Sequence, residues 1–395
     1  MRPNILWIVT TQWRAQATGY AGDSNARTPF LDAMAASAVR FTQAVTPHPF
    51  GPFARAALLT GVRSPENGVR EYFDPLPAGT RTIAHTMGER GYDTGFFGKW
   101  HLGKRDPDAA LVGETHARIV VPPESRGGFE TWEGFESGFL LNDPILHGSR
   151  LPQPVVFPGY QSDVLCEQAA GWIKRSRPWF CVVSLESPHP PYDAGAAGVC
   201  GPDPSALTLR PNVPRGTEVE ARSRRELAGY YAHLEATDRA VGRLVDGIAD
   251  PNTIVVFTSV HGDMHGSHGL FRKGWPYEES VRVPLLVRFP DRKGCMDYAA
   301  ISLQDLPALT ERWSDRLATF AGAPFSRISM PCVVNLPHQC NRTWYGMRTP
   351  QRKLILNADG TPWLFFDLEK DPGEEANLTT DPRRTEELAS LRRLL

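Results

Sequence analysis

The chain has 395 residues, of which 41% are hydrophobic and 22% charged, so it can bury a large core and is not expected to be disordered. Its 43 Lys and Arg residues balance 44 Asp and Glu residues, which argues against nucleic acid or an anionic membrane as a partner. This balance makes a small soluble ligand the expected partner. No apolar run approaches the roughly 18 residues of a membrane-spanning helix.

Short apolar runs rich in β-branched and aromatic residues predict buried strands. They lie at residues 5–9, 94–97, 180–185, 253–258 and 283–287. Helical patterns alternate with them at residues 28–37, 55–60, 82–90, 163–176 and 218–248. This alternation predicts an α/β fold with a large, mainly parallel central sheet flanked by helices. The first run is too short for a signal-peptide core and is interpreted as a strand.

The pattern changes near the end of the chain. Residues 344–348, 352–356 and 362–367 predict short strands, and residues 383–395 predict a closing helix. We therefore expect a main domain over residues 1–335 and a small antiparallel C-terminal subdomain over residues 336–395. Segments 104–160 and 193–220 are rich in Pro and Gly and are predicted to be long ordered loops, which often line the site of an α/β sheet.

Six cysteines show no close metal-type spacing. They stand at positions 166, 181, 200, 295, 332 and 340. We expect a reducing, cytoplasmic location, in which the sequons that begin at Asn341 and Asn377 carry no glycan.

A series of motifs follows in one order along almost the whole chain. They are Arg2-Pro-Asn-Ile-Leu, Thr28-Pro-Phe-Leu-Asp32, Arg55-Ala-Ala-Leu-Leu-Thr-Gly61, Gly98-Lys-Trp-His-Leu-Gly103, Ser187-Pro-His-Pro-Pro191, His261-Gly-Asp, Lys273-Gly and Tyr277-Glu-Glu-Ser-Val-Arg-Val-Pro284. The tail from Asp367 to Asn377-Leu378 fits the same series. Together these motifs resemble the type I sulfatases of the alkaline phosphatase superfamily.

The resemblance implies a Cys or Ser that is oxidised to a formylglycine nucleophile, and a divalent cation held by aspartates. Alignment on Arg55 places Gly51 at the nucleophile, and Phe53 replaces the proline of the modification signal. The metal-ligand positions carry Thr10, Thr11 and Val260, and only the neutral His261 is retained. Calcium and magnesium prefer anionic oxygen ligands. We therefore predict a divergent family member with no formylglycine, metal site or cofactor.

The resemblance also implies which residues hold the anion and serve the nucleophile and leaving group. We predict Lys99, His101, His189, His261 and Lys273 as catalytic residues, and Arg55, Thr10, Thr11 and Gly51 as substrate-binding residues. Without the carboxylates, cations ~4 Å apart interact by ~4 kcal/mol at an effective dielectric constant near 20. Either an anionic ligand binds, or Lys99 or Lys273 loses its proton and becomes a base.

Three functions stay open. The first is a repurposed enzyme that performs metal-independent acid–base, elimination or transfer chemistry on a small sulfated, phosphorylated or carboxylated substrate in a biosynthetic pathway. The second is a non-catalytic pseudosulfatase that binds a ligand or an active relative. The third is a sulfuric or phosphoric ester hydrolase with another nucleophile, such as Thr10 or Thr11.

Two further points stay open at this stage. The cluster His261, Asp263, His265 and His268 has the ligand types of a zinc site, although His268 and Asp263 also match ordinary sulfatase residues. The sequence also leaves open whether the chain forms a homo-oligomer.

Overall fold

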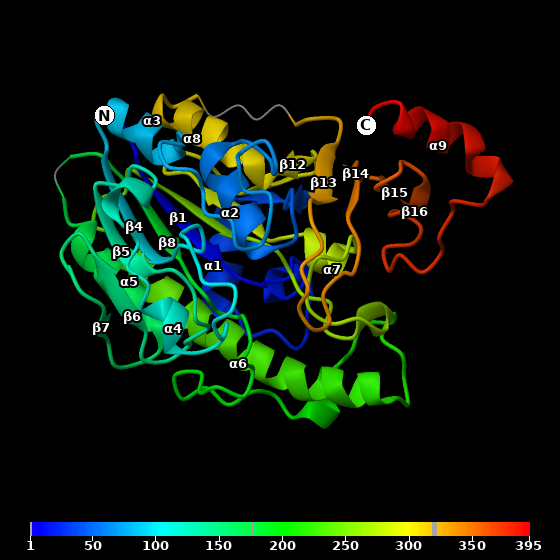
Figure 1. The fold of residues 1–395 in the computed structure, drawn as a ribbon, viewed down its shortest axis with the longest axis horizontal. Helices are drawn as coiled ribbons and strands as arrows, with labels where there is room; N and C mark the ends of the chain where they lie inside the picture. Colours follow the sequence, from blue (N-terminus) through cyan, green and yellow to red (C-terminus); the bar gives the residue numbers. More distant parts are fainter. Residues whose placement is uncertain (1, 176, 318–321) are drawn as a thin grey trace.

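A ten-stranded central sheet forms the middle of the molecule, drawn in Figure 1 from a computed structural model that describes residues 2–175, 177–317 and 322–395. The strand order is β11-β2-β10-β9-β1-β8-β4-β5-β6-β7. Strands β9, β1, β8, β4 and β5 run parallel, whereas β10 and β6 are antiparallel to β9 and β5. The bounds are β1 (Asn4–Thr10), β2 (Val39–Phe41), β4 (Asp93–Lys99), β5 (Thr131–Phe135), β6 (Ile145–Gly148), β7 (Val155–Val156), β8 (Trp179–Ser184), β9 (Thr253–Ser259), β10 (Leu285–Arg288) and β11 (Cys295–Asp297). The predicted mainly parallel sheet is confirmed.

Helices cover both faces of this sheet, because side chains of a strand alternate between the two faces. In β1, Trp7 packs in a core with α2, α3 and α8, whereas Leu6 packs in a second core with α1, α5 and α6. Figure 1 shows the two helix layers above and below the sheet. The bounds are α1 (Pro29–Ser37), α2 (Gly51–Thr60), α3 (Ile83–Glu89), α4 (Glu114–Ala117), α5 (Gln161–Trp172), α6 (Glu218–Asp246), α7 (Glu278–Val281) and α8 (Leu306–Ser314).

A smaller antiparallel sheet of four strands, in the order β13-β14-β15-β16, lies at the right of Figure 1 with helix α9. The bounds are β13 (Ser326–Met330), β14 (Trp344–Arg348), β15 (Arg352–Asn357), β16 (Pro362–Asp367) and α9 (Thr385–Arg392); β3 (Ala44–Val45) and β12 (Ile301–Ser302) form a separate pair. Buried Lys353 of β15 contacts Glu278 of α7 at 2.8 Å and Glu374 at 2.6 Å, which ties the small sheet to the main domain. The predicted boundary between residues 335 and 336 falls between β13 and β14.

The carboxyl ends of four parallel strands meet at one edge of the central sheet. The register pairs Thr10 of β1 with Ser259 of β9, and Ser184 of β8 pairs with both Val9 and Gly98. Segments that are far apart in the sequence but directly follow these strand ends therefore converge. In open α/β sheets this edge is where ligands bind.

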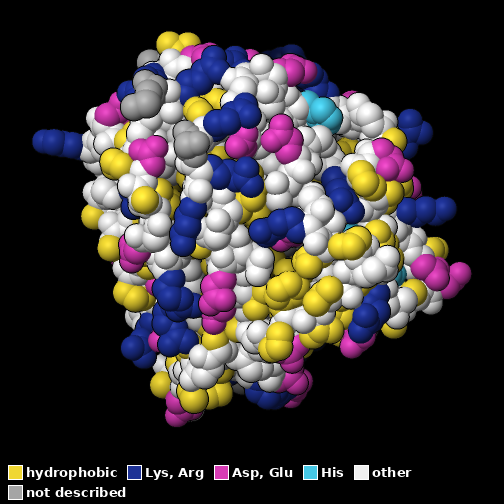
Figure 2. All heavy atoms as spheres, turned by 90° about the vertical axis from the view of Figure 1, so that its left-hand side faces the viewer, with side chains coloured by type: hydrophobic (Ala, Val, Ile, Leu, Met, Phe, Trp, Pro, Cys, Tyr) yellow, Lys and Arg dark blue, Asp and Glu magenta, His cyan; other side chains and the backbone are white. Residues whose placement is uncertain are grey.

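Basic and acidic side chains are interspersed on the face of the molecule that Figure 2 shows. The elements on that side carry ion pairs, such as Arg150 with Glu133 of β5 and Arg243 with Asp163 of α5. This distribution matches the formal net charge of −1. Within the described part of the chain, no helix combines the length and apolar character needed to cross a bilayer.

Three sequence-based expectations differ from the structure. Segment 104–160 is not only loop, because it contains α4, β5, β6 and β7, and β5 extends the sheet beside β4. The pattern missed β5 because Glu133 and Gly134 interrupt its apolar run. Helix α2 begins at Gly51 rather than Arg55, since Pro52 suits the first turn of a helix. Segment 193–220, predicted as a loop, contains the short 3-10 turn Pro204–Ala206 and the start of α6.

Candidate active site

A cavity of about 370 Å³ opens at the carboxyl edge of the central sheet. The predicted site residues that line it are Thr11, Gly51, Lys99, His101, His189, His261 and Lys273. These residues are buried, whereas the more exposed part of the lining is mainly apolar and includes Leu111, Val112, Phe139 and Leu336. The structure thus brings residues from six separate segments into one cavity. Its buried part is basic, and its more exposed part combines apolar residues with Arg222, Arg272 and His338.

Thr10 and Thr11 are successive residues at the end of β1, and their side chains have different surroundings. The Thr10 hydroxyl donates to the carbonyl oxygen of Thr258 at 3.1 Å inside the sheet. Contrary to the prediction, Thr10 does not line the cavity, and Arg55 lies directly behind the lining residues Thr11 and Gly51. The Thr11 hydroxyl donates to the carbonyl oxygen of Leu185 at 2.9 Å and accepts from Arg55 Nη2 at 2.8 Å. Thr11 therefore reaches the cavity with its proton already engaged.

The imidazole of His101 fills the space beside Gly51. A Cβ atom on Gly51 would lie 2.8 Å from His101 Nδ1 and 3.3 Å from Arg55 Nη1. His101 Nε2 faces Arg105 Nη1 at 3.0 Å, and because a guanidinium only donates, the imidazole proton resides on Nδ1. No described residue accepts a hydrogen bond from His101 Nδ1 or from Arg55 Nε and Nη1. Several unpaired N–H groups therefore lie beside the start of α2.

Lys99 is paired with a carboxylate that the sequence analysis did not identify. Its Nζ lies 2.6 Å from Glu186 Oε1, and both side chains are buried. Burial lowers the pKa of Lys99 from 10.5 to about 8, although Glu186 opposes this change. The expectation that the cations lack carboxylate partners is therefore wrong for Lys99. The available signal was a glutamate directly after the apolar run at residues 180–185.

Lys273 lies between Gln12 and His189. Its Nζ is 2.5 Å from Gln12 Oε1 and 2.9 Å from His189 Nε2. His189 Nδ1 lies 2.7 Å from the Pro190 carbonyl oxygen, so Nδ1 carries the proton and Nε2 accepts from Lys273. Burial, together with Lys99, lowers the pKa of Lys273 from 10.5 to about 7 despite the opposing charge of Asp263. Lys273 is thus the basic side chain of the cavity that most readily becomes a neutral amine.

His261 presents an unprotonated nitrogen to the cavity. Its Nδ1 donates to the Gly262 carbonyl oxygen at 2.8 Å, which leaves Nε2 bare and unpartnered among the residues described. Burial and the nearby charge of Lys273 hold the pKa of His261 well below its usual value. The pKa values of His101 and His189 also lie well below the usual value. Burial is the main cause for both, and the next is the charge of Lys99 for His101 and of Lys273 for His189. All three histidines are therefore neutral at pH 7.

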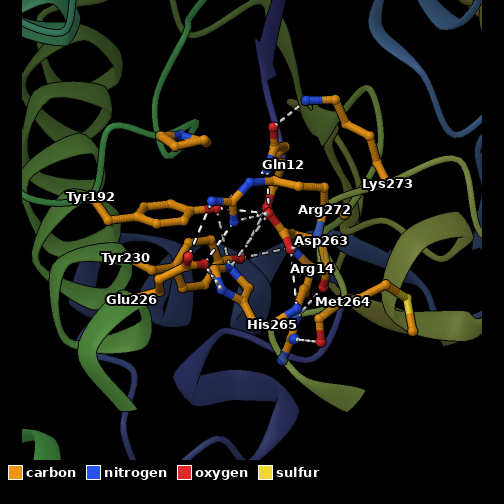
Figure 3. A network of polar contacts seen from close by, with 12 residues as sticks. Gln12, Arg14, Tyr192, Glu226, Tyr230, Asp263, Met264, His265, Arg272 and Lys273 are labelled. Atoms are coloured by element: carbon orange, nitrogen blue, oxygen red, sulfur yellow. Dashed lines mark hydrogen bonds and ion pairs between the residues drawn. The ribbon is translucent and has the colours of Figure 1, made fainter. Parts of the chain in front are cut away.

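Asp263 forms the centre of a polar network beside Lys273, drawn in Figure 3. Its Oδ1 accepts the backbone N–H groups of His265 and Arg272, both at 3.0 Å. Its Oδ2 accepts from Gln12 Nε2 at 2.5 Å and from the Tyr192 hydroxyl at 2.8 Å. Burial alone would raise the pKa of Asp263, but His265 and Arg272 hold it below its usual value. Both oxygens of this buried carboxylate are therefore occupied by donors.

Comparison with known proteins decides the family. The family model named Sulfatase matches residues 3–309. The chain belongs to the sulfatase family. It is 34% identical to an ulvan-active sulfatase of Formosa agariphila over 96% of this chain and 78% of that protein. It is 26% identical to an arylsulfatase of Clostridium perfringens over 100% of this chain and 94% of that protein.

Solved structures agree with this assignment. A candidate sulfatase from Bacteroides fragilis superposes with a TM-score of 0.85 at 26% identity and covers 100% of this chain and 94% of its own. A phosphonate monoester hydrolase of Agrobacterium radiobacter superposes with a TM-score of 0.76 at 21% identity, covering 100% of this chain and 96% of its own, which shows a shared fold.

The residues of this sulfatase-family chain do not fit the divalent cation that the family resemblance implies. Thr10 and Thr11 offer neutral hydroxyls that are bonded to backbone carbonyls, and the side chain of Val260 is buried in the apolar core. Asp263 is a nearby carboxylate, but hydrogen-bond donors already occupy both of its oxygens. Calcium and magnesium require several free oxygen ligands, which this arrangement does not supply.

The alternative zinc site is not assembled either. His268 stacks on Tyr277 with ring centroids 4.0 Å apart and faces Asn212 Nδ2, away from the cavity lining. His265 packs against Tyr230 with ring centroids 4.4 Å apart. Across residues 2–175, 177–317 and 322–395, no group of three or more His, Cys, Asp or Glu side chains is arranged to hold a metal ion. The imidazoles of His265 and His268 instead pack against tyrosine rings.

Proposed function

We propose that this sulfatase-family protein does not hydrolyse sulfate esters through formylglycine and a metal ion, but binds a small anionic substrate for metal-independent acid–base chemistry. The surroundings of Gly51 carry the proposal. His101 Nδ1 lies 2.8 Å from the position of a Cβ on Gly51, so the nucleophile of the family resemblance is missing and the space beside it is filled. The same cavity keeps its basic and imidazole side chains, which supports continued use of the site.

Unpaired donors support an anionic substrate. Arg55 is buried, and two of its guanidinium nitrogens lack a partner in the described part of the chain. Burial lowers the pKa of Arg55 to about 10, so the guanidinium stays charged at neutral pH. Leaving buried charged donors unpaired is costly, and a carboxylate, sulfate or phosphate oxygen would satisfy them. The relatives named above as sulfatases support sulfate as one member of this anion class.

Lys273 supports the acid–base part of the proposal. With a pKa of about 7, roughly half of the Lys273 side chains are neutral amines at pH 7, which suits a general base. The amine accepts a proton from a carbon or oxygen atom next to the anionic group and becomes an ammonium. In a carboxylated substrate, an electron pair left on carbon delocalises into the carboxylate held by Arg55. In a sulfated or phosphorylated substrate, it forms a C=C bond and expels the sulfate or phosphate from the neighbouring carbon. The Lys273 ammonium can then return the proton to the substrate, while the Nδ1–H of His101, unpaired among the described residues, can donate a hydrogen bond to it.

The two other functions receive different support. A non-catalytic binding protein is favoured by the Lys99–Glu186 pair, because an internal carboxylate lowers the electrostatic cost of an empty cavity. An ester hydrolase that uses Thr11 is less well supported. The Thr11 hydroxyl proton points to a backbone carbonyl, and its oxygen accepts from Arg55 rather than facing a base. We also propose a reducing, cytoplasmic location, which the six unpaired cysteines support.

Solvent hydrogen exchange tests this function without knowledge of the natural reaction. The protein, treated with EDTA, is incubated in D2O with a panel of carboxylated, sulfated and phosphorylated small molecules, and deuterium incorporation is followed by NMR. We expect exchange into at least one anion class, lost in Lys273→Met and kept in the control Lys104→Met, whose side chain is exposed. Release of sulfate from aryl sulfates that requires added calcium would contradict the proposal.

A further inference from the structure

Gln12 separates Lys273 from the carboxylate of Asp263. Its Oε1 accepts from Lys273 Nζ, and its Nε2 donates to Asp263 Oδ2, as Figure 3 shows. The two ends of a glutamine amide are not equivalent, and here the carboxylate decides their orientation. Because a carboxylate only accepts, Nε2 must face Asp263 and the carbonyl oxygen must face the amine. The lysine therefore contacts a neutral acceptor instead of an anion.

Asp263 also fixes the loop that carries Lys273. Its Oδ1 accepts the backbone N–H of Arg272, the residue directly before Lys273, and that of His265. Tyr192 donates to Oδ2 and completes the set of donors. The Asp263 carboxylate thus holds both the backbone next to Lys273 and the Gln12 amide that accepts a hydrogen bond from the Lys273 ammonium.

We infer that Gln12 and Asp263 are positioning residues that aim Lys273 at the cavity and keep it out of an ion pair, so that it can act as the proton acceptor. The catalytic consequence of this inference rests on the proposed acid–base function. The positioning of Lys273 by Gln12 and Asp263 can be tested without a substrate. The charged and titratable groups that face Lys273 are Asp263, Glu186, Lys99, Arg272, His101, His189 and His261. Of these, Lys99 and Arg272 favour the neutral amine, whereas Asp263 and Glu186 oppose it.

Two variants of the pair Gln12 and Asp263 should shift the pKa of Lys273 in opposite directions. In Asp263→Asn, the backbone N–H groups keep the amide oxygen of the new side chain, so its NH2 group faces Gln12. The Gln12 amide must then turn and present N–H to Lys273, which disfavours the ammonium. In the double variant Gln12→Glu with Asp263→Asn, the amide and the carboxylate exchange places. The hydrogen bond between the two positions is retained, but the negative charge now touches Lys273.

Competitive acetylation with acetic anhydride, read by peptide mass spectrometry at a series of pH values, measures the neutral fraction of each lysine. The chain has seven lysines, and the exposed Lys104, Lys174, Lys293 and Lys370 serve as internal references. We expect the midpoint for Lys273 to fall in Asp263→Asn and to rise by about 1–3 pH units in the exchanged pair. The exposed Gln153→Glu places a new carboxylate away from Lys273 and should leave the midpoint unchanged.

Turnover and stability distinguish the possible results. If Lys273 acts as the base, the pH at which deuterium exchange reaches half its maximum should move with the acetylation midpoint in the exchanged pair. Should Asp263→Asn not fold, the exchanged pair carries the test by itself. The positioning role would be overturned if the acetylation midpoint of Lys273 did not change in the folded variants. It would also be overturned if both variants lost equal thermal stability and the midpoint did not shift in opposite directions. Midpoints that move in a protein without any exchange activity would keep that role and refute the acid–base function instead.

Discussion

Replacing Lys273 by Met should stabilise the protein at acidic pH, although it removes a residue from the candidate site. The pKa of Lys273 is lowered from 10.5 to about 7, so the folded protein resists charging this side chain. One pH unit corresponds to about 1.4 kcal/mol, which places the penalty below pH 7 at up to about 5 kcal/mol. Lost hydrogen bonds to Gln12 and His189 reduce the gain to about 2 kcal/mol.

The sign of the pH dependence follows from proton binding. Between about pH 7 and 10.5 the unfolded chain binds a proton at Lys273 that the folded chain releases, so wild-type stability rises with pH over this window. The advantage of Lys273→Met should therefore be largest near pH 6, vanish near pH 8.5 and turn into a small net loss by about pH 9. Urea unfolding at pH 6, 7.5 and 9 measures it. A pH-independent loss of stability in Lys273→Met would refute the reasoning.

A matched control is available in the same chain. Lys353 is equally buried, but it contacts the carboxylates of Glu278 and Glu374 at 2.8 and 2.6 Å. Lys353→Met leaves Glu374 without its cation, while Glu278 keeps Arg348 at 3.0 Å, and should cost about 3–5 kcal/mol near neutral pH. Opposite effects of the two Lys→Met changes would separate the penalty for a poorly paired ammonium from a general effect of losing a buried lysine.

Three further predictions concern the same cavity. Gly51→Ser should lower the free energy of unfolding by about 1–3 kcal/mol, because its Cβ would contact His101 Nδ1 at 2.8 Å, and the loss should be smaller in a His101→Ala background, as measured by thermal unfolding. Glu186→Gln should cost about 3–5 kcal/mol in urea unfolding at pH 7, since it leaves the Lys99 ammonium buried without its anion. Affinity for sulfate should decline as pH rises through about 7 and 8, where Lys273 and Lys99 lose their charges, and titration calorimetry at pH 6, 7.5 and 9 should record this fall.

The fold followed closely from sequence patterns where apolar runs were continuous. The strand predicted at residues 5–9 is β1, and the helix predicted at residues 218–248 is α6. Strand β5 was missed because Glu133, which pairs with Arg150, lies within it, so the run lacks apolar continuity. Strand β13 was also missed, since it alternates buried and half-buried residues over only five positions.

The site was predicted less completely than the fold. Motif spacing identified Lys99, His189 and Lys273, which the structure gathers in one cavity. It did not identify Glu186 or Gln12, because their contacts with Lys99 and Lys273 depend on how distant segments meet. Thr10 was included through its motif, but the side chain is turned into the sheet, and a one-residue step along a strand reverses the direction of a side chain. Pair contacts of this kind require the tertiary structure.

The central claim is that the cavity binds an anion without a metal ion. Titration calorimetry of sulfate, phosphate and benzoate into the EDTA-treated protein at pH 6.5, with elemental analysis of the same sample, tests it most directly. We expect stoichiometric binding of at least one of these anions to protein that contains no calcium or magnesium, and loss of that binding in Arg55→Met. Binding that appears only after calcium or magnesium is added, at one ion per chain, would contradict the account.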